Sequence, residues 1–183
     1  MFNTVSSLGA WLLAAALAFA LAFASPTESN VMGEFAPFES QTLAQQTLRV
    51  PDGLPKHRTL ALVTFKRDHS AQAESWIQGL NLRNDPSIAW LRMPVINDPG
   101  TPQGRNEIKE KLLGHYPAEA ERARLLPAFV DRDSYTRAAG LADTGKAYAV
   151  VLNRQGDVLA RVEGAYNADK ARALRETLQA PGY

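Results

Sequence analysis

The sequence contains no cysteine among its 183 residues. This absence excludes disulfide bonds, thiolate nucleophiles, iron–sulfur clusters and zinc sites built on thiolates. It also removes the usual marker of an oxidising compartment, so the location of the protein has to be predicted from its N-terminus. Thiol redox chemistry is therefore closed to this chain.

A large charge of one sign is also lacking. Lysine and arginine together number 20, aspartate and glutamate number 19, and the formal net charge is +1. A chain so balanced provides no extended positive field of the kind that holds nucleic acid. We therefore expect no nucleic-acid partner.

Histidine is scarce, and its three copies are not arranged as metal ligands. His57, His69 and His115 lie far apart in the sequence, and none is paired with another histidine at helical spacing. Asp131 and Asp133 lack the glycine and the closing glutamate of a calcium-binding loop. The sequence thus predicts no metal site and no cofactor.

The apolar run Leu8–Phe23 ends in the A-x-A pattern Ala22-Phe23-Ala24. It is shorter than the roughly 20 residues of a membrane-spanning helix, which favours a cleaved signal peptide over residues 1–24. A linker over residues 25–40 and a folded domain over residues 41–183 would follow. Because no lysine or arginine precedes the run, an uncleaved signal anchor is the alternative. Both readings predict export to the periplasm or another extracytoplasmic space, the second as a membrane-anchored protein facing outside the cytoplasm.

Two apolar segments and one amphipathic segment predict the centre of an α/β domain. Thr59–Phe65 carries apolar residues on both faces, which is typical of a central strand covered by helices on both sides. Ser70 can cap the helix that follows, in which Trp76 faces the sheet and Gly79 lies near the end. Ile88–Ile96 is predicted as a second strand, parallel to the first.

Weaker patterns predict the remaining elements. These are a hairpin within residues 41–55, a surface helix at 105–113, a short helix at 117–125, a helix capped by Asp133 or Ser134 and ending at Gly140, a strand at 147–152, a half-exposed strand at 158–163 and a last helix capped by Asn167. The two final strands would form a hairpin around the turn at 153–157.

This order of elements resembles a thioredoxin-like domain, in which a parallel first half is followed by an antiparallel hairpin. The segment VLNRQGDVLARVEGAY is similar to the closing hairpin of the peroxiredoxin and thiol-disulfide branch. Together with Ser75-Trp76 it also resembles the mitochondrial ATP synthase assembly factor family, whose members are thioredoxin-like chaperones. The resemblance covers roughly Leu48–Leu178. It implies a mixed sheet flanked by helices and a role in the assembly of a membrane complex.

The resemblance also places the positions at which a thioredoxin would hold its thiols. They fall at about Ser70 and Ala73, and neither side chain can cycle between thiol and disulfide. The cis-proline that usually faces the thiols would fall near Ala147 or Tyr148, where no proline occurs. The resemblance therefore implies a domain without redox activity.

The polar cluster at the carboxyl end of the first strand is the candidate site, because open α/β sheets bind ligands at that edge. Our candidate binding residues are Lys66, Arg67, Asp68, His69, Ser70 and Trp76. The competing interpretations are a polar loop that only covers the end of the sheet, and a core position for Trp76. We assign no catalytic residue, since the adjacent side chains of Asp68, His69 and Ser70 cannot converge as a hydrolase triad.

The segment Gly140–Ala147 has the spacing of a phosphate-binding loop, but it precedes a predicted strand and lacks the metal-binding hydroxyl at Ala147. We therefore predict an exported, non-redox, thioredoxin-like protein that binds another protein, such as an assembly factor of a membrane complex. One alternative is an enzyme with non-thiol chemistry at Lys66 to Ser70. The other is a structural domain tethered to a membrane by its uncleaved N-terminus.

Overall fold

The structure is a computed structural model that describes residues 31–180. Its elements are β1 (Phe38–Gln41), β2 (Thr47–Val50), β3 (Arg58–Thr64), α2 (His69–Gly79), β4 (Trp90–Asn97), α3 (Pro102–His115), α4 (Glu119–Arg122), β5 (Ala128–Val130), α5 (Arg132–Ala138), β6 (Tyr148–Asn153), β7 (Val158–Glu163) and α6 (Ala168–Gln179). The predicted signal or anchor segment lies outside the described residues.

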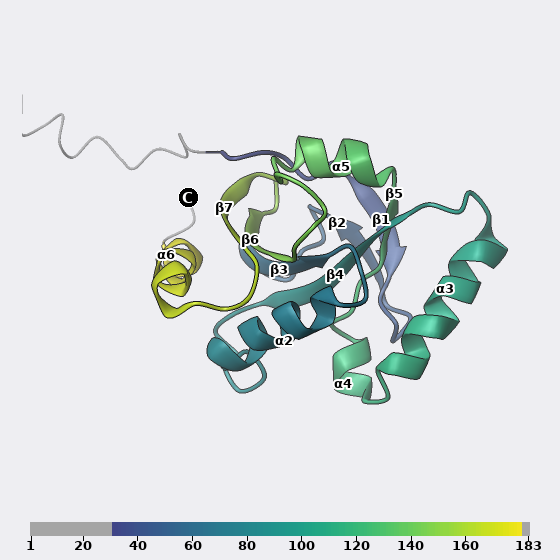
Figure 1. The fold of residues 1–183 in the computed structure, drawn as a ribbon, viewed down its shortest axis with the longest axis horizontal. Helices are drawn as coiled ribbons and strands as arrows, with labels where there is room; N and C mark the ends of the chain where they lie inside the picture. The colour runs from purple at the N-terminus through teal and green to yellow at the C-terminus, as the bar shows by residue number, and fades with distance from the viewer. Residues whose placement is uncertain (1–30, 181–183) are drawn as a thin grey trace, which may run out of the picture. The chain divides into compact units, whose positions relative to one another are not determined.

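The central sheet has the strand order β5-β4-β3-β6-β7 (Figure 1). The strand β3 lies parallel to β4 and antiparallel to β6, while β4 pairs in parallel with β5. The strands β6 and β7 form the predicted closing hairpin. The position of β3 in the middle of the sheet confirms the prediction made from Thr59–Phe65.

The parallel strands β3 and β4 end at the same edge of the sheet. Their last paired residues are Thr64 and Pro94, and the ladder between β4 and β5 begins one residue later, at Val95. Proline cannot donate a ladder hydrogen bond, so a position where one ladder ends and another begins can accommodate it. The carboxyl ends of both strands therefore open onto the loop between β3 and α2.

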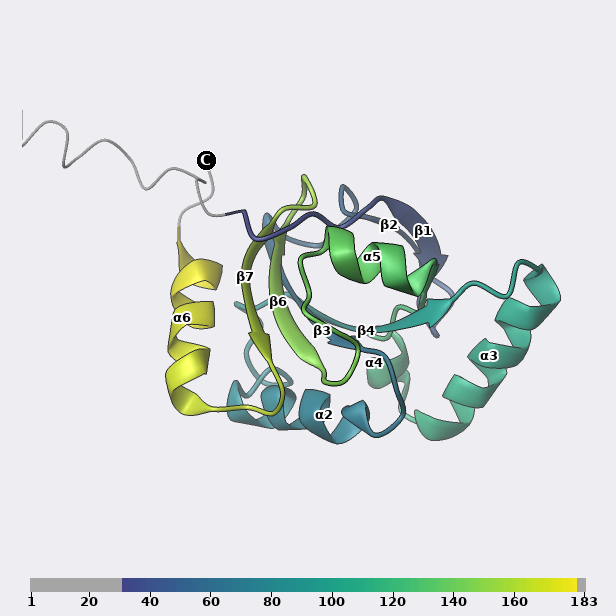
Figure 2. The same ribbon diagram turned by 45° about the horizontal axis from the view of Figure 1, so that its top comes forward.

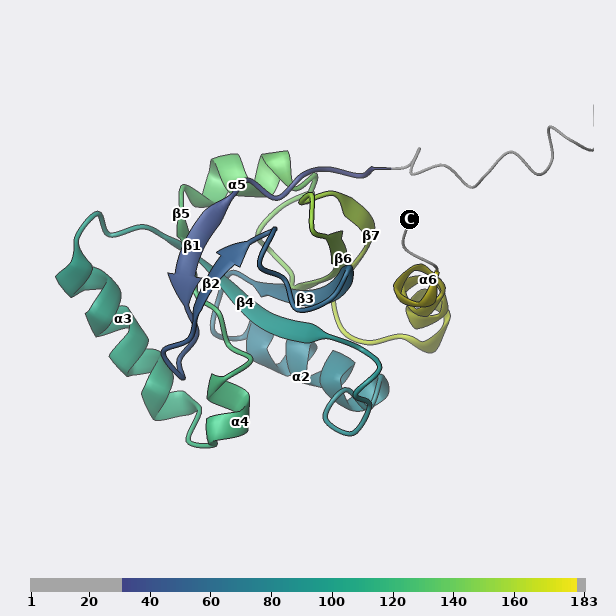
Figure 3. The ribbon, with the colours of Figure 1, turned by 180° about the vertical axis from the view of Figure 1, so that it is seen from behind.

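Successive residues of β3 alternate between two apolar layers. Leu60 and Leu62 pack with α2 and α6 on one face of the sheet. Ala61 and Val63 pack with α5 and with the β1–β2 hairpin on the other face. Figure 2 shows α2 and α5 on opposite sides of the sheet, and Figure 3 shows the hairpin from behind. Both faces are thus covered, as a strand without alternating polarity requires.

The folded part of the chain begins inside the range 25–40, which the sequence assigned to a linker. The backbone N–H of Met32 donates to Val158 (2.9 Å), and that of Phe35 donates to Gly156 (2.8 Å). Phe35 is fully buried and packs edge-on against Tyr135, with ring centroids 5.1 Å apart. No helix within residues 31–180 is long and apolar enough to cross a membrane.

Several element boundaries differ from the prediction. The helix α2 begins at His69 with Asp68 in the N-cap position, so Ser70 lies inside the first turn. The helix α5 is capped by Asp131, whose Oδ1 accepts the N–H of Ser134 (2.8 Å), and not by Asp133 or Ser134. The helix α4 is only four residues long, and β5 was not predicted.

Candidate functional site

A pocket of about 240 Å³ lies at the carboxyl ends of β3 and β4, between α2 and α3. We call it the strand-end pocket. It is lined by Thr64, Phe65, Lys66, Arg67, Ser70, Ala73, Arg92, Pro94, Val95, Ile96, Ile108, Lys111, Leu112, His115, Tyr116 and Leu125. About half of these side chains are apolar, and the lining includes lysines and arginines but no carboxylate of the described residues. The pocket lies at the edge of the sheet where the sequence placed the candidate site.

The structure divides the six predicted site residues into two groups. Lys66, Arg67 and Ser70 line the strand-end pocket. Asp68 is exposed outside it, while His69 and Trp76 are buried in the interior, each only 1 % exposed. The predicted cluster is therefore not one site, because the turn at the start of α2 directs neighbouring side chains to different places.

His69 connects the loop after β3 to the loop before β6. Its Nδ1 accepts the backbone N–H of Phe65 (3.3 Å), and its Nε2 lies 3.2 Å from the carbonyl oxygen of Gly145. Because an N–H can only donate and a carbonyl can only accept, these two contacts assign the acceptor role to Nδ1 and the donor role to Nε2. His69, a candidate binding residue in the sequence, does not line the strand-end pocket. The residue is a buried structural bridge.

A second side chain of α2 holds the same loop. Gln72 Oε1 accepts the backbone N–H of Ala147 (2.9 Å). Lys146, the lysine of the phosphate-loop spacing, donates to Glu163 Oε1 (2.6 Å) and so has an acidic partner. The segment leads into β6 and does not open a helix, which leaves it without the geometry of a phosphate-binding loop.

Trp76 lies in the core between α2 and the sheet, as its helical spacing predicts. Its indole Nε1 donates to the carbonyl oxygen of Gly164 (2.9 Å), which satisfies the polar edge of the ring. Its ring packs edge-on against Tyr166 at a centroid distance of 5.3 Å. Trp76 thus connects α2 to the segment after β7 and does not reach the strand-end pocket.

Below the pocket, two arginines and two glutamates form an ion-pair network that joins α2, β4 and α4. Arg83 donates to both carboxylate oxygens of Glu74 (2.7 and 3.0 Å) and to Glu121 (2.8 Å). The guanidinium of Arg92, whose side chain is only 7 % exposed, also contacts both carboxylates. The hydrogen bond from Arg83 lowers the pKa of Glu74 from 4.5 to about 2. The charge of Arg92 is therefore balanced inside the protein.

Three other cationic side chains at the pocket have no carboxylate partner within residues 31–180. Lys66, Arg67 and Lys111 are exposed, and none of their charged groups has a hydrogen bond or ion pair with another residue of the described range 31–180. Lys66 and Arg67 lie on the β3–α2 loop, whereas Lys111 comes from α3. No aspartate or glutamate of the described residues lines the pocket. The mouth of the pocket is accordingly positive.

The positions that would hold thiols in a thioredoxin lie on the wall of this pocket. Ser70 is half-buried and Ala73 is 2 % exposed, and both line the pocket. His69 cannot activate Ser70 as a general base, because both of its ring nitrogens are engaged by backbone groups. The wall offers a hydroxyl and apolar surface, without a nucleophile paired to a base.

Sequence reasoning missed the part of the site contributed by β4 and α3. Arg92, Ile108, Lys111 and Leu112 lie well beyond the β3–α2 loop in sequence, on β4 and α3, and only the fold brings them to it. The spacing of Ile108 and Leu112, four residues apart beside Lys111, predicts a helix with one apolar side. It does not indicate that this side faces a pocket.

No protein-family model matches the sequence, and no curated protein matches it. Solved structures match the fold. BsSco, of the Sco family of cytochrome c oxidase assembly proteins, is 14 % identical with a TM-score of 0.52, over 79 % of this chain and 91 % of that one. A candidate electron transfer protein from Aquifex aeolicus VF5 is 11 % identical with a TM-score of 0.57, over 84 % and 97 %.

The pneumococcal exposed lipoprotein thioredoxin Etrx1, from Streptococcus pneumoniae strain TIGR4, is 15 % identical with a TM-score of 0.51, over 80 % of this chain and 100 % of that one. Identities this low establish a shared fold and nothing finer. The sheet order, the position of α2 after the central strand and these likenesses lead to one conclusion: the chain has a cysteine-free thioredoxin-like fold.

Proposed function

We propose that this chain is an exported, non-redox, thioredoxin-like protein that binds another protein at its strand-end pocket, as an assembly factor of a membrane complex. The observation that carries the proposal is the chemistry of the pocket. Where a thioredoxin would present thiols, this chain presents apolar surface beside unpaired cations. Such a surface can bind a partner but cannot exchange disulfides.

The names of structural neighbours support the extracytoplasmic and assembly aspects of the proposal. BsSco belongs to a family of cytochrome c oxidase assembly proteins, and Etrx1 is an exposed lipoprotein. The apolar N-terminal run and its A-x-A pattern are also what an exported chain requires. The narrower resemblance to the mitochondrial ATP synthase assembly factors remains a prediction, supported by Ser75-Trp76 and the closing hairpin.

An enzymatic alternative at Lys66 to Ser70 gains no support from the geometry. General-base catalysis needs a group with a free lone pair within reach of the nucleophile. The nitrogens of His69 contact Phe65 and Gly145. His115 lines the pocket together with Ser70, but its Nδ1 contacts the carbonyl oxygen of Lys111 (2.7 Å), and within residues 31–180 the hydroxyl of Ser70 has no hydrogen bond to either imidazole. We therefore retain binding as the proposed function.

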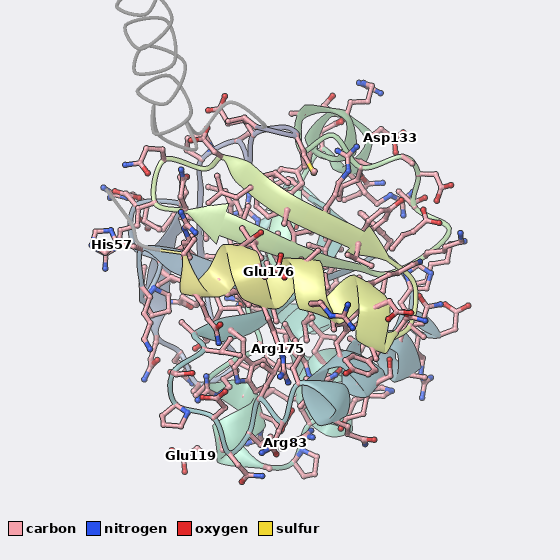
Figure 4. All side chains as sticks on the ribbon, turned by 90° about the vertical axis from the view of Figure 1, so that its left-hand side faces the viewer. His57, Arg83, Glu119, Asp133, Arg175 and Glu176 are labelled. Atoms are coloured by element: carbon pink, nitrogen blue, oxygen red, sulfur yellow. The ribbon has the colours of Figure 1, made fainter. Side chains whose placement is uncertain are left out.

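A pull-down from detergent-solubilised envelope tests this function. The wild-type chain should recover a partner in stoichiometric amount, and the double charge reversal Lys66→Glu/Arg67→Glu should weaken recovery at least tenfold. The control reverses two exposed charges on α6, Lys170→Glu/Arg175→Glu, and should recover as much partner as wild type. Figure 4 shows Arg175 on α6, which lies at the opposite end of the domain from α3 in Figure 1. Recovery of no partner by either the wild type or the control would contradict the proposal.

A further inference from the structure

We infer that the strand-end pocket accepts a short acidic segment of the partner, which inserts one or two apolar side chains and places carboxylates against Lys66, Arg67 and Lys111. This inference rests on the proposed function and specifies the chemistry of its partner. It is carried by charge complementarity, by the size of the pocket and by the incomplete packing of α3.

The charges at the pocket select an anionic partner. Lys66 and Arg67 approach from the β3–α2 loop and Lys111 from α3, so the cations belong to two separate walls. Arg92, deeper in the same pocket, already contacts Glu74 and Glu121 and adds no uncompensated charge. Unpaired surface cations contribute little to folding, but they increase the rate and specificity of association with an acidic surface.

The packing of α3 indicates that one wall of the pocket is incomplete. This helix has 14 residues and buries none of them fully. Its apolar residues Ile108 and Leu112 are half-buried and face the pocket. Because helices in proteins gain most of their stability by burying an apolar face, a partner side chain between α3 and the sheet would complete that burial.

The size of the pocket favours a side-chain anchor over a cofactor. Sites for drug-sized ligands usually enclose about 300–1,000 Å³, and the strand-end pocket has about 240 Å³. An extended or helical peptide that anchors one or two apolar side chains and leaves its backbone outside matches this volume. The acidic residues that flank such an anchor would meet the cations at the mouth.

Selection from a random 12-residue peptide library, with the full-length chain immobilised in mild detergent, tests the inference directly. Enriched peptides should combine Leu, Ile or Phe with neighbouring Asp or Glu. Their affinity should fall at least tenfold in Lys66→Glu/Arg67→Glu, and several-fold between 0.1 and 0.5 M salt because exposed charges are screened. The variant Lys170→Glu/Arg175→Glu should bind them as wild type does.

A second variant separates the apolar anchor from the charges. Leu112→Trp places a larger side chain at the pocket wall and should weaken binding of the selected peptides at least fivefold, while circular dichroism and the melting temperature report whether the variant folds. If Leu112→Trp fails to fold, the charge-reversal variant still tests whether the peptides bind at this pocket, because it is altered only at exposed positions. Hydrogen exchange in α3 should slow when a selected peptide is added.

The possible outcomes distinguish this inference from the proposed function. If the pull-down yields a partner but the library yields no acidic and apolar peptides, the inference fails and the proposed function stands. The inference would also fail if the selected peptides bound the Lys66→Glu/Arg67→Glu variant as tightly as the wild type. Saturable binding of decanoate without peptide enrichment would identify a small carboxylate as the occupant, and a dimer abolished by the charge reversal would identify a second copy of the chain. Either result would overturn the inference that an acidic peptide occupies the pocket.

Discussion

At the scale of single residues, His69 shows how a site-like side chain can serve the fold. A histidine at the start of the helix after the central strand lies where catalytic groups often occur, yet this ring is 1 % exposed and bonded at both nitrogens to backbone. His69 and Gly145 are separated by 76 residues in the sequence. His69 and Gln72 therefore connect the loop before β6 to the same helix, α2.

His69→Leu should therefore destabilise the protein strongly. The change leaves the N–H of half-buried Phe65 without its partner, and a buried unsatisfied group costs about 1–3 kcal/mol. The carbonyl of Gly145 belongs to an exposed residue and can bond to water instead, so we expect the free energy of unfolding, measured by urea titration, to fall by about 1–3 kcal/mol. His57→Leu is the control, because His57 is exposed (Figure 4) and should change stability by less than about 0.5 kcal/mol. Equal effects of the two substitutions would exclude the bridging role.

At the scale of secondary-structure elements, the network of Glu74, Arg83, Arg92 and Glu121 joins α2 to β4 and α4. The short helix α4 has no buried residue, so its position depends on polar contacts more than on burial. Glu121 supplies that contact through Arg83 and Arg92. The same network fixes Arg92 in the pocket and keeps its charge compensated, which leaves the exposed cations to determine the sign of the mouth.

The network should make the free energy of unfolding depend on pH in the acidic range. The pKa of Glu74 in the folded protein is about 2, below its ordinary value of 4.5, so the folded state binds fewer protons than the unfolded state between these values. Its stabilising contribution is complete above about pH 4.5 and is lost as the pH falls toward about 2. Glu74→Gln should remove this part of the pH dependence and lower stability at pH 7 by about 1–2 kcal/mol.

The measurement is urea unfolding of wild type and variant at several pH values between 2 and 7. Other carboxylates with lowered pKa values, Asp98 and Asp131 among them, titrate in both proteins, so the difference between the two curves isolates Glu74. Glu176→Gln is the control, since Glu176 is exposed on α6 (Figure 4). Parallel curves for wild type and Glu74→Gln would show that the network does not couple to folding.

The elements with strong patterns could be predicted from the sequence, and the reasons are physical. Apolar residues on both faces of β3 require two covering layers, and Asn167 caps α6 through its own side chain, whose Oδ1 accepts the N–H groups of Asp169 and Lys170. The three-residue strand β5 is too short to show the alternation of apolar and polar residues that indicates a strand. The helix α2 ends at Gly79, as the sequence predicts, but a Cβ there would also lie 2.5 Å from the ring of Tyr166. This requirement for glycine is tertiary, and sequence spacing does not reveal it.

The candidate site was predictable only in part, for a related reason. The segment Lys66–Ser70 was found because strand ends in α/β sheets are a general place for ligands. Which of its side chains face the pocket depends on the start of α2, and the opposite wall comes from α3. Contacts between distant segments carry no local periodicity, so Lys111 and Leu112 had no signal that marked them as part of a site.

At the scale of the whole molecule, the position at which the folded part begins determines which stabilising contacts remain after the N-terminal segment is cleaved. The earliest described backbone hydrogen bond is that of Met32, and Glu34 and Phe35 add two more. The predicted cleavage after Ala24 would leave all of them intact. Cleavage or truncation beyond Phe35 would remove a fully buried aromatic ring from the layer that contains Tyr135.

We therefore expect N-terminal sequencing of the protein made in cells to begin near Ser25, and a chain that starts at Ser25 to unfold at the same urea concentration as the full-length chain. A chain that starts at Pro37 should lose about 3–5 kcal/mol, the usual cost of removing a buried phenylalanine side chain, because it lacks Phe35 and the backbone bonds of residues 32–35. Equal stability of the two shortened chains would show that this segment does not belong to the folded unit. A chain from cells that still begins at Met1 would instead favour the signal anchor, and the protein would then face its partner from the membrane surface.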